Sequence, residues 1–512
     1  MLAADAAPGA EATRLLRRIG FWRCLSTAIL LYLFVQIAIR AGRQSITGDE
    51  AYNYFLYLTG SLGKVFLANY DTNNHVMYTA LAWLSTHWFG LNEFNLRIPS
   101  VLSAALYLVT VYRLSSFLFG RRVLHPLAAV LLAGNPYILD FFTVARGYGL
   151  ALAFFALALL NVLVIAREKI ASDRALLRIG VWSAVAVTAN LGLLFPISAL
   201  FVALTAAMSR IGLGGRTELW AIVLRIVRSS FGPFLVFSFC FLVMPLHSAQ
   251  KDSFYFGAER WPHTIESLVT PSLFHNLRAP LLARWPGLFW AMMQALETWF
   301  IPMLAFLVMA FTIFCLVRRR EDNPALLVSG VTFTAAVFIL TFAHVALQVK
   351  LPIMRTGIYF LLLLPLALLS LFCYQRRSIG HWTGLALTPV FVFWAALYVP
   401  QWTARATSDW RYDASTRDFA QTIEALRAYT GATDIKVGGS WIFEPALNFY
   451  RQKFGYTQWQ PVPRNAKLTD PADYYVISGN EREAIAAQHL RVILDDRVSG
   501  SILAVGGQPC AH

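Results

Sequence analysis

The chain has 512 residues, of which 57% are hydrophobic and only 14% carry a charge. Soluble domains have roughly a quarter of their residues charged. The composition therefore excludes an ordinary soluble enzyme and indicates a protein with many membrane spans. The formal net charge of +15 does not indicate nucleic acid, because the basic residues stand in short runs between apolar segments, as in cytoplasmic loops. We expect the bilayer as a partner and no nucleic acid.

Apolar segments long enough to cross a membrane occur throughout the first four fifths of the chain. A helix needs roughly 20 apolar residues to cross the hydrocarbon core. Single spans are predicted at 24–40, 97–118, 123–140, 147–166, 231–247, 299–317, 325–347, 356–374 and 382–400. The uncharged stretch 179–209 is too long for one crossing and has arginines on both sides. It is predicted to leave and return as two short spans broken at Pro196. The expected fold is mainly α, a polytopic bundle of about eleven transmembrane helices.

The basic runs give the bundle an orientation. Arginines at 121–122, 318–320 and 376–377 are expected in the cytoplasm, because positively charged short loops stay inside. The acidic pair at 49–50 and the loop 248–298 then fall on the outer face. The first loop of the bundle, 41–96, is thereby predicted to be periplasmic.

The composition changes near Gln401, after which the sequence is typical of a small α/β domain. Helical periodicity covers 415–429 and 443–454, whereas 435–437 and 474–477 are strand-like. The expected parts are a cytoplasmic N-terminal tail at 1–23, a transmembrane domain at 24–400, and a soluble periplasmic α/β domain at 401–512.

An acidic pair, Asp49-Glu50, directly follows the first predicted span. Placing a charged side chain next to a bilayer costs free energy, so a structural or functional explanation is needed. Gly48-Asp49 could simply cap a helix that begins at Ala51. A cap needs one acceptor, however, and here there are two carboxylates. A carboxylate that is partly desolvated at a membrane face can act as a general base, so both acids are candidate catalytic residues.

A second polar cluster, Asn73-Asn74-His75, follows Asp71 in the same loop. These residues could form a turn and helix cap, or they could bind a sugar or phosphate. An amphipathic helix is predicted over 76–88, lying in the membrane interface. Its apolar face is formed by Met77, Leu81, Leu84 and Trp88.

Charged residues also stand at the outer ends of later spans. Asp140 and Arg146 share a very short outer turn, while Lys350 and Arg355 lie outside against the positive-inside pattern. Each could be an interface anchor. Alternatively, the cations could bind a phosphate, with Asp140 orienting an acceptor or a basic partner. Arg97, at the start of the second span, allows the same two interpretations.

Several short segments carry a resemblance to a known family. In this sequence they are Gly48-Asp-Glu-Ala-Tyr52, Asn73-Asn-His-Val-Met-Tyr78, Arg97-Ile-Pro-Ser100, Ala145-Arg-Gly-Tyr148, and Arg355 with Tyr359 and Pro365. Over roughly residues 20–370 their order and spacing resemble the GT-C superfamily of polyprenyl-phosphate-sugar glycosyltransferases. The similarity is to the bacterial branch related to protein O-mannosyltransferases and the lipid A aminoarabinose transferase. Val76 and Met77 stand where that branch commonly has proline after the histidine.

The resemblance implies a GT-C-like bundle in the bacterial inner membrane that transfers a sugar with inversion from a polyprenyl-phosphate donor. The acceptor, a glycan, lipid or protein that the sequence does not identify, would react on the periplasmic face. Asp49 would be the base, Tyr148 and Tyr359 would contact sugar or acceptor, and a divalent metal such as Mg or Mn could be held by Asp49, Glu50 or His75. Fixed cations stabilise a leaving phosphate, which fits Arg146, Lys350 and Arg355.

Two alternatives stay open from the sequence. A transporter or lipid flippase would need ionisable residues near the membrane centre and symmetric halves, whereas the predicted spans are nearly free of charge at their centres. A surface-polysaccharide ligase would share the donor chemistry and transfer a whole glycan. The C-terminal aromatic residues could stack on an acceptor sugar or form a core; they are Trp402, Trp410, Trp441, Tyr450 and Trp459.

Overall fold

The computed structural model describes residues 8–120, 122–212, 218–249, 256–274, 278–317, 323–373, 378–403, 405–464 and 467–506. The chain divides into two compact units. One, here called the helical unit, comprises Met1–Val35, Leu102–Phe142 and Gly147–Trp402. The other, the mixed unit, comprises Gln36–Val101, Thr143–Arg146 and Thr403–His512. The predicted cytoplasmic arginines 121, 318–320 and 376–377 lie outside the described residues.

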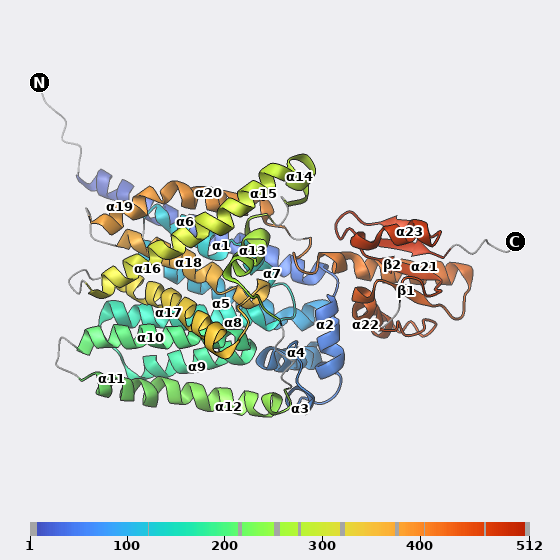
Figure 1. The fold of residues 1–512 in the computed structure, drawn as a ribbon, viewed down its shortest axis with the longest axis horizontal. Coiled ribbons are helices and arrows are strands. Elements are labelled where there is room, and N and C mark those ends of the chain that lie inside the picture. Colours follow the sequence, from blue (N-terminus) through green and yellow to red (C-terminus); the bar gives the residue numbers. More distant parts are fainter. Residues whose placement is uncertain are drawn as a thin grey trace, which may run out of the picture. The chain divides into compact units, whose positions relative to one another are not determined.

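The helical unit is a bundle of long apolar helices (Figure 1). In chain order its helices are α1 (Pro8–Arg43, shared with the mixed unit), α5 (Glu93–Phe119, likewise shared), α6 (Leu124–Ala133), α7 (Pro136–Asp140), α8 (Gly147–Glu168), α9 (Asp173–Ala189), α10 (Leu194–Gly212), α11 (Leu219–Ile226), α12 (Gly232–His247), α13 (Trp261–Leu273), α14 (Arg278–Arg284), α15 (Pro286–Ala295), α16 (Ile301–Val317), α17 (Pro324–Leu347), α18 (Phe360–Ser370), α19 (Ile379–Ala386) and α20 (Thr388–Tyr398). Helix α17 packs against α8, α10, α16 and α18.

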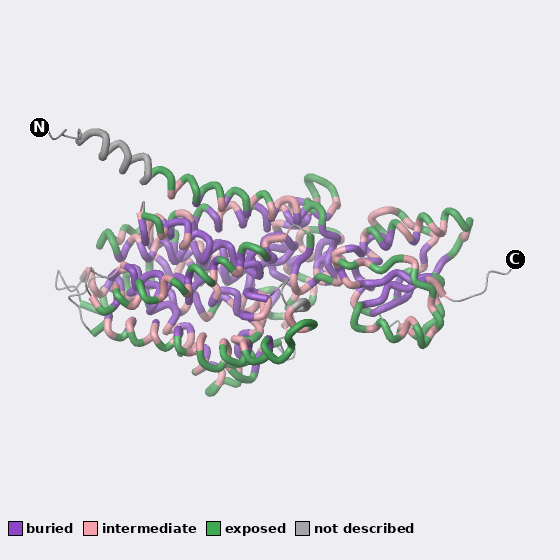
Figure 2. The backbone as a smooth tube through the Cα atoms, turned by 90° about the horizontal axis from the view of Figure 1, so that it is seen from above, coloured by how far each residue is buried: buried purple, intermediate pink, exposed green. Residues whose placement is uncertain are grey.

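The burial of the helices separates the inside of the bundle from its rim. Most residues of α8 and all of α18 but Leu361 are buried, and the interior of the bundle is purple in Figure 2. Outer helices instead expose large apolar side chains, among them Phe239, Phe306 and Phe338. Exposing such large apolar surfaces to water is energetically unfavourable, so these helix faces suit contact with lipid.

Nine helical segments among the described residues are long and apolar enough to cross a membrane. They are Gly20–Arg43, Glu93–Phe119, Gly147–Glu168, Leu191–Ile211, Leu219–His247, Pro286–Val317, Pro324–Leu347, Met354–Cys373 and Ile379–Gln401. At two further predicted positions the helices are shorter: α6 is an apolar helix of 10 residues, and α9 has 17 residues. The prediction of a mainly α-helical, polytopic bundle is confirmed. Helix α1 is already helical at Pro8, within the stretch predicted as an N-terminal tail.

The predicted break at Pro196 was wrong in position. The stretch does form two helices, but α9 ends at Ala189, and Asn190 takes an extended conformation whose side chain accepts from the Gly192 amide at 3.0 Å. Pro196 lies in the first turn of α10. Amides in a first turn have no intrahelical acceptor, so proline costs nothing there.

The predicted span 123–140 is also interrupted. Helix α6 ends at Ala133, and the Asn135 side chain then accepts hydrogen bonds from the amides of Tyr137 and Ile138 at 2.9 and 3.3 Å. Pro136 occupies the first position of α7. An asparagine cap followed by proline starts a new helix, which explains why one apolar run makes two elements.

The C-terminal part of the mixed unit contains a four-stranded sheet of order β1-β2-β4-β3. Strands β1 (Val437–Gly439) and β2 (Tyr474–Ile477) are parallel, whereas β4 (Ile502–Val505) is antiparallel to β2 and to β3 (Arg491–Asp495). Helices α21 (Thr416–Thr430), α22 (Glu444–Phe454) and α23 (Glu483–Ala487) complete this α/β region. The two predicted helices and the 474–477 strand are confirmed, and β1 overlaps the predicted 435–437 strand.

The first loop forms the other part of the mixed unit. It contains α2 (Gly48–Asn53), a π-helical turn at Tyr54–Leu58, α3 (Gly63–Leu67) and α4 (Val76–Phe89). Helix α4 matches the predicted amphipathic helix. The predicted apolar face is its less buried side: Met77, Leu81 and Leu84 are partly exposed, and Trp88 is exposed. The position of this helix in the membrane interface stays a prediction.

Candidate active site

The start of α2 is built by a reciprocal capping arrangement. Thr47 is the cap residue: its hydroxyl accepts from the Glu50 amide at 3.3 Å, and the Glu50 carboxylate accepts from the Thr47 amide at 2.8 Å. Such a box satisfies two amides that a helix start leaves without partners. The helix that carries Asp49 and Glu50 is therefore fixed at its first turn, but its cap is Thr47 and it begins at Gly48, three residues before the predicted start at Ala51.

Glu50 is fully occupied by internal contacts. Arg97 donates from Nε to Glu50 Oε1 at 2.7 Å and from Nη2 to Oε2 at 2.6 Å, and both side chains are completely buried. The Ala145 amide donates to the same Oε1. Each carboxylate oxygen thus accepts two hydrogen bonds. This geometry gives Glu50 the role of holding the site together.

Arg97 connects three segments of the mixed unit. Besides Glu50, its guanidinium donates to main-chain carbonyls at the end of α1 and the linker after it, at distances of 2.8 to 3.0 Å; they belong to Ala41, Gln44 and Ser45. A buried guanidinium is tolerated only when its charge and its N–H groups have partners. Arg97 therefore positions the linker that leads into Asp49, and its complete burial does not match an interface anchor.

Asp49 differs from its neighbour in being accessible. Its side chain is 26% exposed, whereas that of Glu50 is fully buried. Arg146 Nη2 lies 3.8 Å from Asp49 Oδ2, and the Arg146 side chain is buried. The same Nη2 donates to Asn73 Oδ1 at 2.7 Å. The structure thus brings Asp49, Asn73 and Arg146 together from three distant places in the sequence.

The turn that presents Asn73 is held by Asp71. Asp71 Oδ1 accepts from the Asn73 amide at 2.8 Å, and the Asp71 amide donates to the Tyr57 hydroxyl oxygen at 2.9 Å. Asn74 is buried, and its side-chain amide donates to the Val65 carbonyl at 3.0 Å. His75 is buried at the cap position of α4. The turn interpretation is therefore correct for this segment, and the turn also aims Asn73 at Arg146.

A carboxylate from the C-terminal region completes the site. Asp413 is fully buried; its Oδ2 accepts from the Gly48 amide at 2.7 Å, and its Oδ1 accepts from the Thr416 hydroxyl at 3.2 Å. Burial raises the pKa of Asp413 well above the usual range, and the nearby negative charges of Asp49 and Glu50 act in the same direction. The sequence analysis missed this residue, because a single aspartate far along the chain has no local signal.

A second polar cluster ties the C-terminal region to the first loop. The Tyr450 hydroxyl donates to Glu93 Oε1 at 2.9 Å and accepts from the Ile46 amide at 2.8 Å. Burial raises the pKa of Tyr450 well above its ordinary value, so the hydroxyl keeps its proton. Lys453 and Arg417 both pair with Glu93. Residues 403 onward are therefore part of the unit that holds Asp49.

The remaining predicted site residues belong to the helical unit. Asp140 is buried at the end of α7, and Tyr148 is buried with its ring 5.0 Å from that of Phe141. Tyr359 is fully buried at the start of α18. Lys350 forms an ion pair with Glu259. The Arg355 guanidinium lies 5.4 Å from the Phe256 ring centre.

The residues proposed as metal ligands are not gathered into a metal-binding group. Among the described residues, no group of three or more His, Cys, Asp or Glu side chains is placed to hold a metal ion. Glu50 is moreover committed to Arg97. We therefore derive no step of the chemistry through a metal.

The C-terminal aromatic residues divide into core and surface. Trp410, Trp459 and Tyr450 are buried, and the Trp402 indole donates to the Gly134 carbonyl within the helical unit at 2.7 Å. Trp441 alone of these five is exposed. Four of the five are thus structural, and Trp441 stays available for a ligand.

Comparison with known proteins gives distant structural likenesses. No family model and no curated protein matches the chain. The fold is similar to that of ArnT from Cupriavidus metallidurans bound to undecaprenyl phosphate, with 16% identity, 95% of this chain and 99% of that chain covered, and a TM-score of 0.39. The Archaeoglobus fulgidus oligosaccharyltransferase tethered to an acceptor peptide has 11% identity, coverages of 91% and 70%, and a TM-score of 0.44. Arabinofuranosyltransferase AftD from Mycobacteria has 14% identity, coverages of 95% and 40%, and a TM-score of 0.42. These similarities concern the fold alone.

Proposed function

We propose that this chain is an integral-membrane inverting glycosyltransferase of the GT-C type. It moves a sugar from a polyprenyl-phosphate donor to an acceptor hydroxyl or phosphate on the periplasmic face of the bacterial inner membrane. The observation that carries the proposal is the contrast between Asp49 and Glu50. One carboxylate is accessible beside a buried arginine, and the other is fully used to fix its position.

Asp49 is the general base in this proposal. It takes the proton of the acceptor hydroxyl as the oxygen attacks the anomeric carbon from the side opposite the phosphate. A new bond joins the anomeric carbon to the acceptor oxygen, and the bond to the phosphate oxygen breaks. Polyprenyl phosphate leaves with the electron pair, and the proton stays on Asp49. General-base assistance of this kind contributes about 10²- to 10⁴-fold in rate.

Arg146 fits two tasks in this scheme. Before the donor binds, its guanidinium pairs with Asp49, with Nη2 lying 3.8 Å from Asp49 Oδ2. Its fork can also bind phosphate oxygens, and Asn73 fixes the direction of that fork. Lys350 and Arg355 stay predicted ligands of the donor phosphate. Lys350 would exchange its pairing with Glu259 for that phosphate.

The test is sugar transfer by purified protein in nanodiscs, with a panel of labelled polyprenyl-phosphate sugars and cell-envelope acceptor extracts. We expect transfer by the wild type and a loss of at least about 100-fold in Asp49→Asn, with an unchanged unfolding temperature. Asp434→Asn is the matched control, because Asp434 is exposed on the same unit and bonds only the surface residue Gln460. Near-wild-type transfer by Asp49→Asn would overturn the base assignment. Donor uptake into proteoliposomes without any sugar transfer would instead favour a flippase.

A further inference from the structure

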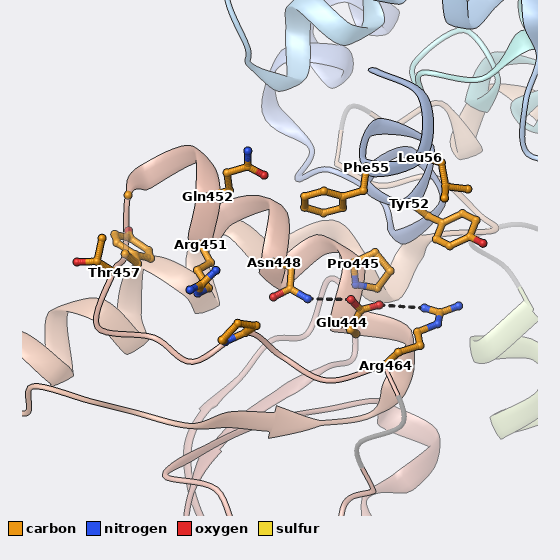
Figure 3. A pocket seen from close by; sticks show the side chains of 13 residues that line it. Tyr52, Phe55, Leu56, Glu444, Pro445, Asn448, Arg451, Gln452, Thr457 and Arg464 are labelled. Atoms are coloured by element: carbon orange, nitrogen blue, oxygen red, sulfur yellow. Dashed lines mark hydrogen bonds and ion pairs between the residues drawn. The ribbon is translucent and has the colours of Figure 1, made fainter. Parts of the chain in front are cut away.

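A groove in the mixed unit lies between the first loop and helix α22. Its volume is about 730 Å³, within the range of about 300 to 1,000 Å³ that small-molecule sites occupy. Figure 3 shows Tyr52, Phe55 and Leu56 on one side, facing Asn448, Arg451 and Gln452 of α22 on the other. The roles assigned above leave this groove unused.

The chemistry of the walls suits a sugar. The first loop contributes two aromatic rings, Tyr52 and Phe55, and α22 contributes the Gln452 amide and the Arg451 guanidinium as donors. Apolar ring faces beside hydrogen-bond donors match a sugar, which has an apolar C–H face and a rim of hydroxyl groups. Two arginines and one glutamate line the groove, so its charge balance favours an anionic ligand.

The polar wall is held in place before any ligand arrives. Glu444 accepts from the Asn448 side-chain amide at 2.8 Å and from Arg464 Nη1 at 3.2 Å. Asn448 also exchanges two hydrogen bonds of 2.9 Å with the main chain of Val462. Arg451 Nε donates to the Trp459 carbonyl at 2.7 Å. A fixed wall loses little side-chain entropy when a ligand binds.

Arg464 is the residue suited to an acidic group. Its guanidinium lies 5.2 Å from the Trp441 ring and 5.6 Å from the Tyr52 ring, which are cation–π distances. Its side chain is nevertheless 50% exposed. An oriented and accessible guanidinium can bind a carboxylate or phosphate through two parallel hydrogen bonds.

Helix α2 joins the groove to the proposed base. Tyr52 follows Asp49 by three residues on this helix, and residues three apart lie on neighbouring positions of one helix face, about 4.5 Å apart along the axis. We propose that the groove is the acceptor subsite and takes a saccharide that carries an anionic group. This inference rests on the proposed glycosyltransferase function.

The experiment measures saccharide binding to the full-length protein, without requiring transfer. The probes are a glucuronic-acid-containing disaccharide, a phosphorylated disaccharide and a neutral disaccharide of the same size, measured by calorimetry in nanodiscs. We expect at least one anionic probe to bind about tenfold more tightly than the neutral one. Arg464→Gln should abolish that preference, since a charge-assisted hydrogen bond is worth roughly tenfold in affinity. Phe55→Leu should weaken all binding by removing a ring face.

The matched control is Arg482→Gln. Arg482 is 49% exposed and pairs with Asp495 at 2.7 Å, in the same unit but away from the groove residues. It should leave binding unchanged. Equal binding of charged and neutral probes, no binding of any probe, or equal losses in Arg464→Gln and Arg482→Gln would overturn the inference. Because binding is measured apart from transfer, a groove that binds in a chain without transfer would count against the proposed function alone.

Discussion

The Gly48 amide donates a 2.7 Å hydrogen bond to Asp413 Oδ2, so a carboxylate from the C-terminal region holds the residue that precedes Asp49. The contact is close: a Cβ on Gly48 would lie 3.1 Å from the Ile442 carbonyl oxygen and 3.6 Å from Asp413 Oδ2. Residues 413 and 442 therefore set the position at which α2 begins. The C-terminal region therefore helps to position the site residues, in addition to any role in covering them.

Asp413→Asn should change how stability depends on pH. The folded state raises the pKa of Asp413, so it binds a proton more tightly than the unfolded chain, whose aspartates titrate near about 3.9. The favourable contribution is complete below that unfolded pKa and is lost as the pH rises to the folded pKa. Asparagine keeps an acceptor for Gly48 but does not titrate. The unfolding temperature of the variant, measured from pH 4 to pH 8, should therefore fall less than that of the wild type.

Two further variants make this prediction specific. Asp434→Asn, at an exposed aspartate, should follow the wild-type curve. Asp413→Ala should be less stable at every pH by about 1–3 kcal/mol, because the buried Gly48 amide loses its acceptor. Parallel curves for the wild type and Asp413→Asn would show that Asp413 is ionised in both states.

The sequence predicted local elements better than the framework around the site. Patterns of apolar residues and turns placed the long helices, α4 and β2, because periodicity and capping are local properties. They also identified Asp49, Asn73 and Arg146, which the fold brings together. Proline at 196 misled the prediction, since a proline in a first turn is tolerated as well as one at a break. Only the fold distinguishes the two cases.

Such local patterns cannot reveal contacts between residues that are far apart in the sequence. The bond between residues 48 and 413 spans 365 positions, and nothing near Asp413 marks it as buried. Glu50 and Asp49 are adjacent acids in the sequence, yet one turns inward to Arg97 and the other stays accessible. Strand β3 was missed because most of its residues are exposed, which leaves a weak pattern of burial.

Glu50→Gln should destabilise the protein strongly. The amide is the same size as the carboxylate, but it leaves the fully buried Arg97 without a counter-charge. Removing one member of a buried pair costs about 3–5 kcal/mol. Chemical unfolding monitored by tryptophan fluorescence should show this loss. In the control Asp495→Asn, whose pair with Arg482 is half exposed, the change should be much smaller, because solvent-exposed ion pairs contribute little to stability. Equal effects of the two substitutions would contradict the positioning role of Glu50.

Arg146→Lys and Asn73→Ala should affect transfer through one shared contact. Lysine keeps the charge near Asp49, but it loses the guanidinium fork that donates to the Asn73 side chain at 2.7 Å and to its carbonyl at 3.4 Å. We expect each single variant to lower kcat/KM about 10- to 100-fold with little change in unfolding temperature. The double variant should lose little more than the worse single variant, because residues in one hydrogen-bond network are not additive. Fully additive losses in this double-mutant cycle would mean that Asn73 and Arg146 act separately, and that the fork does not orient the arginine for the donor phosphate.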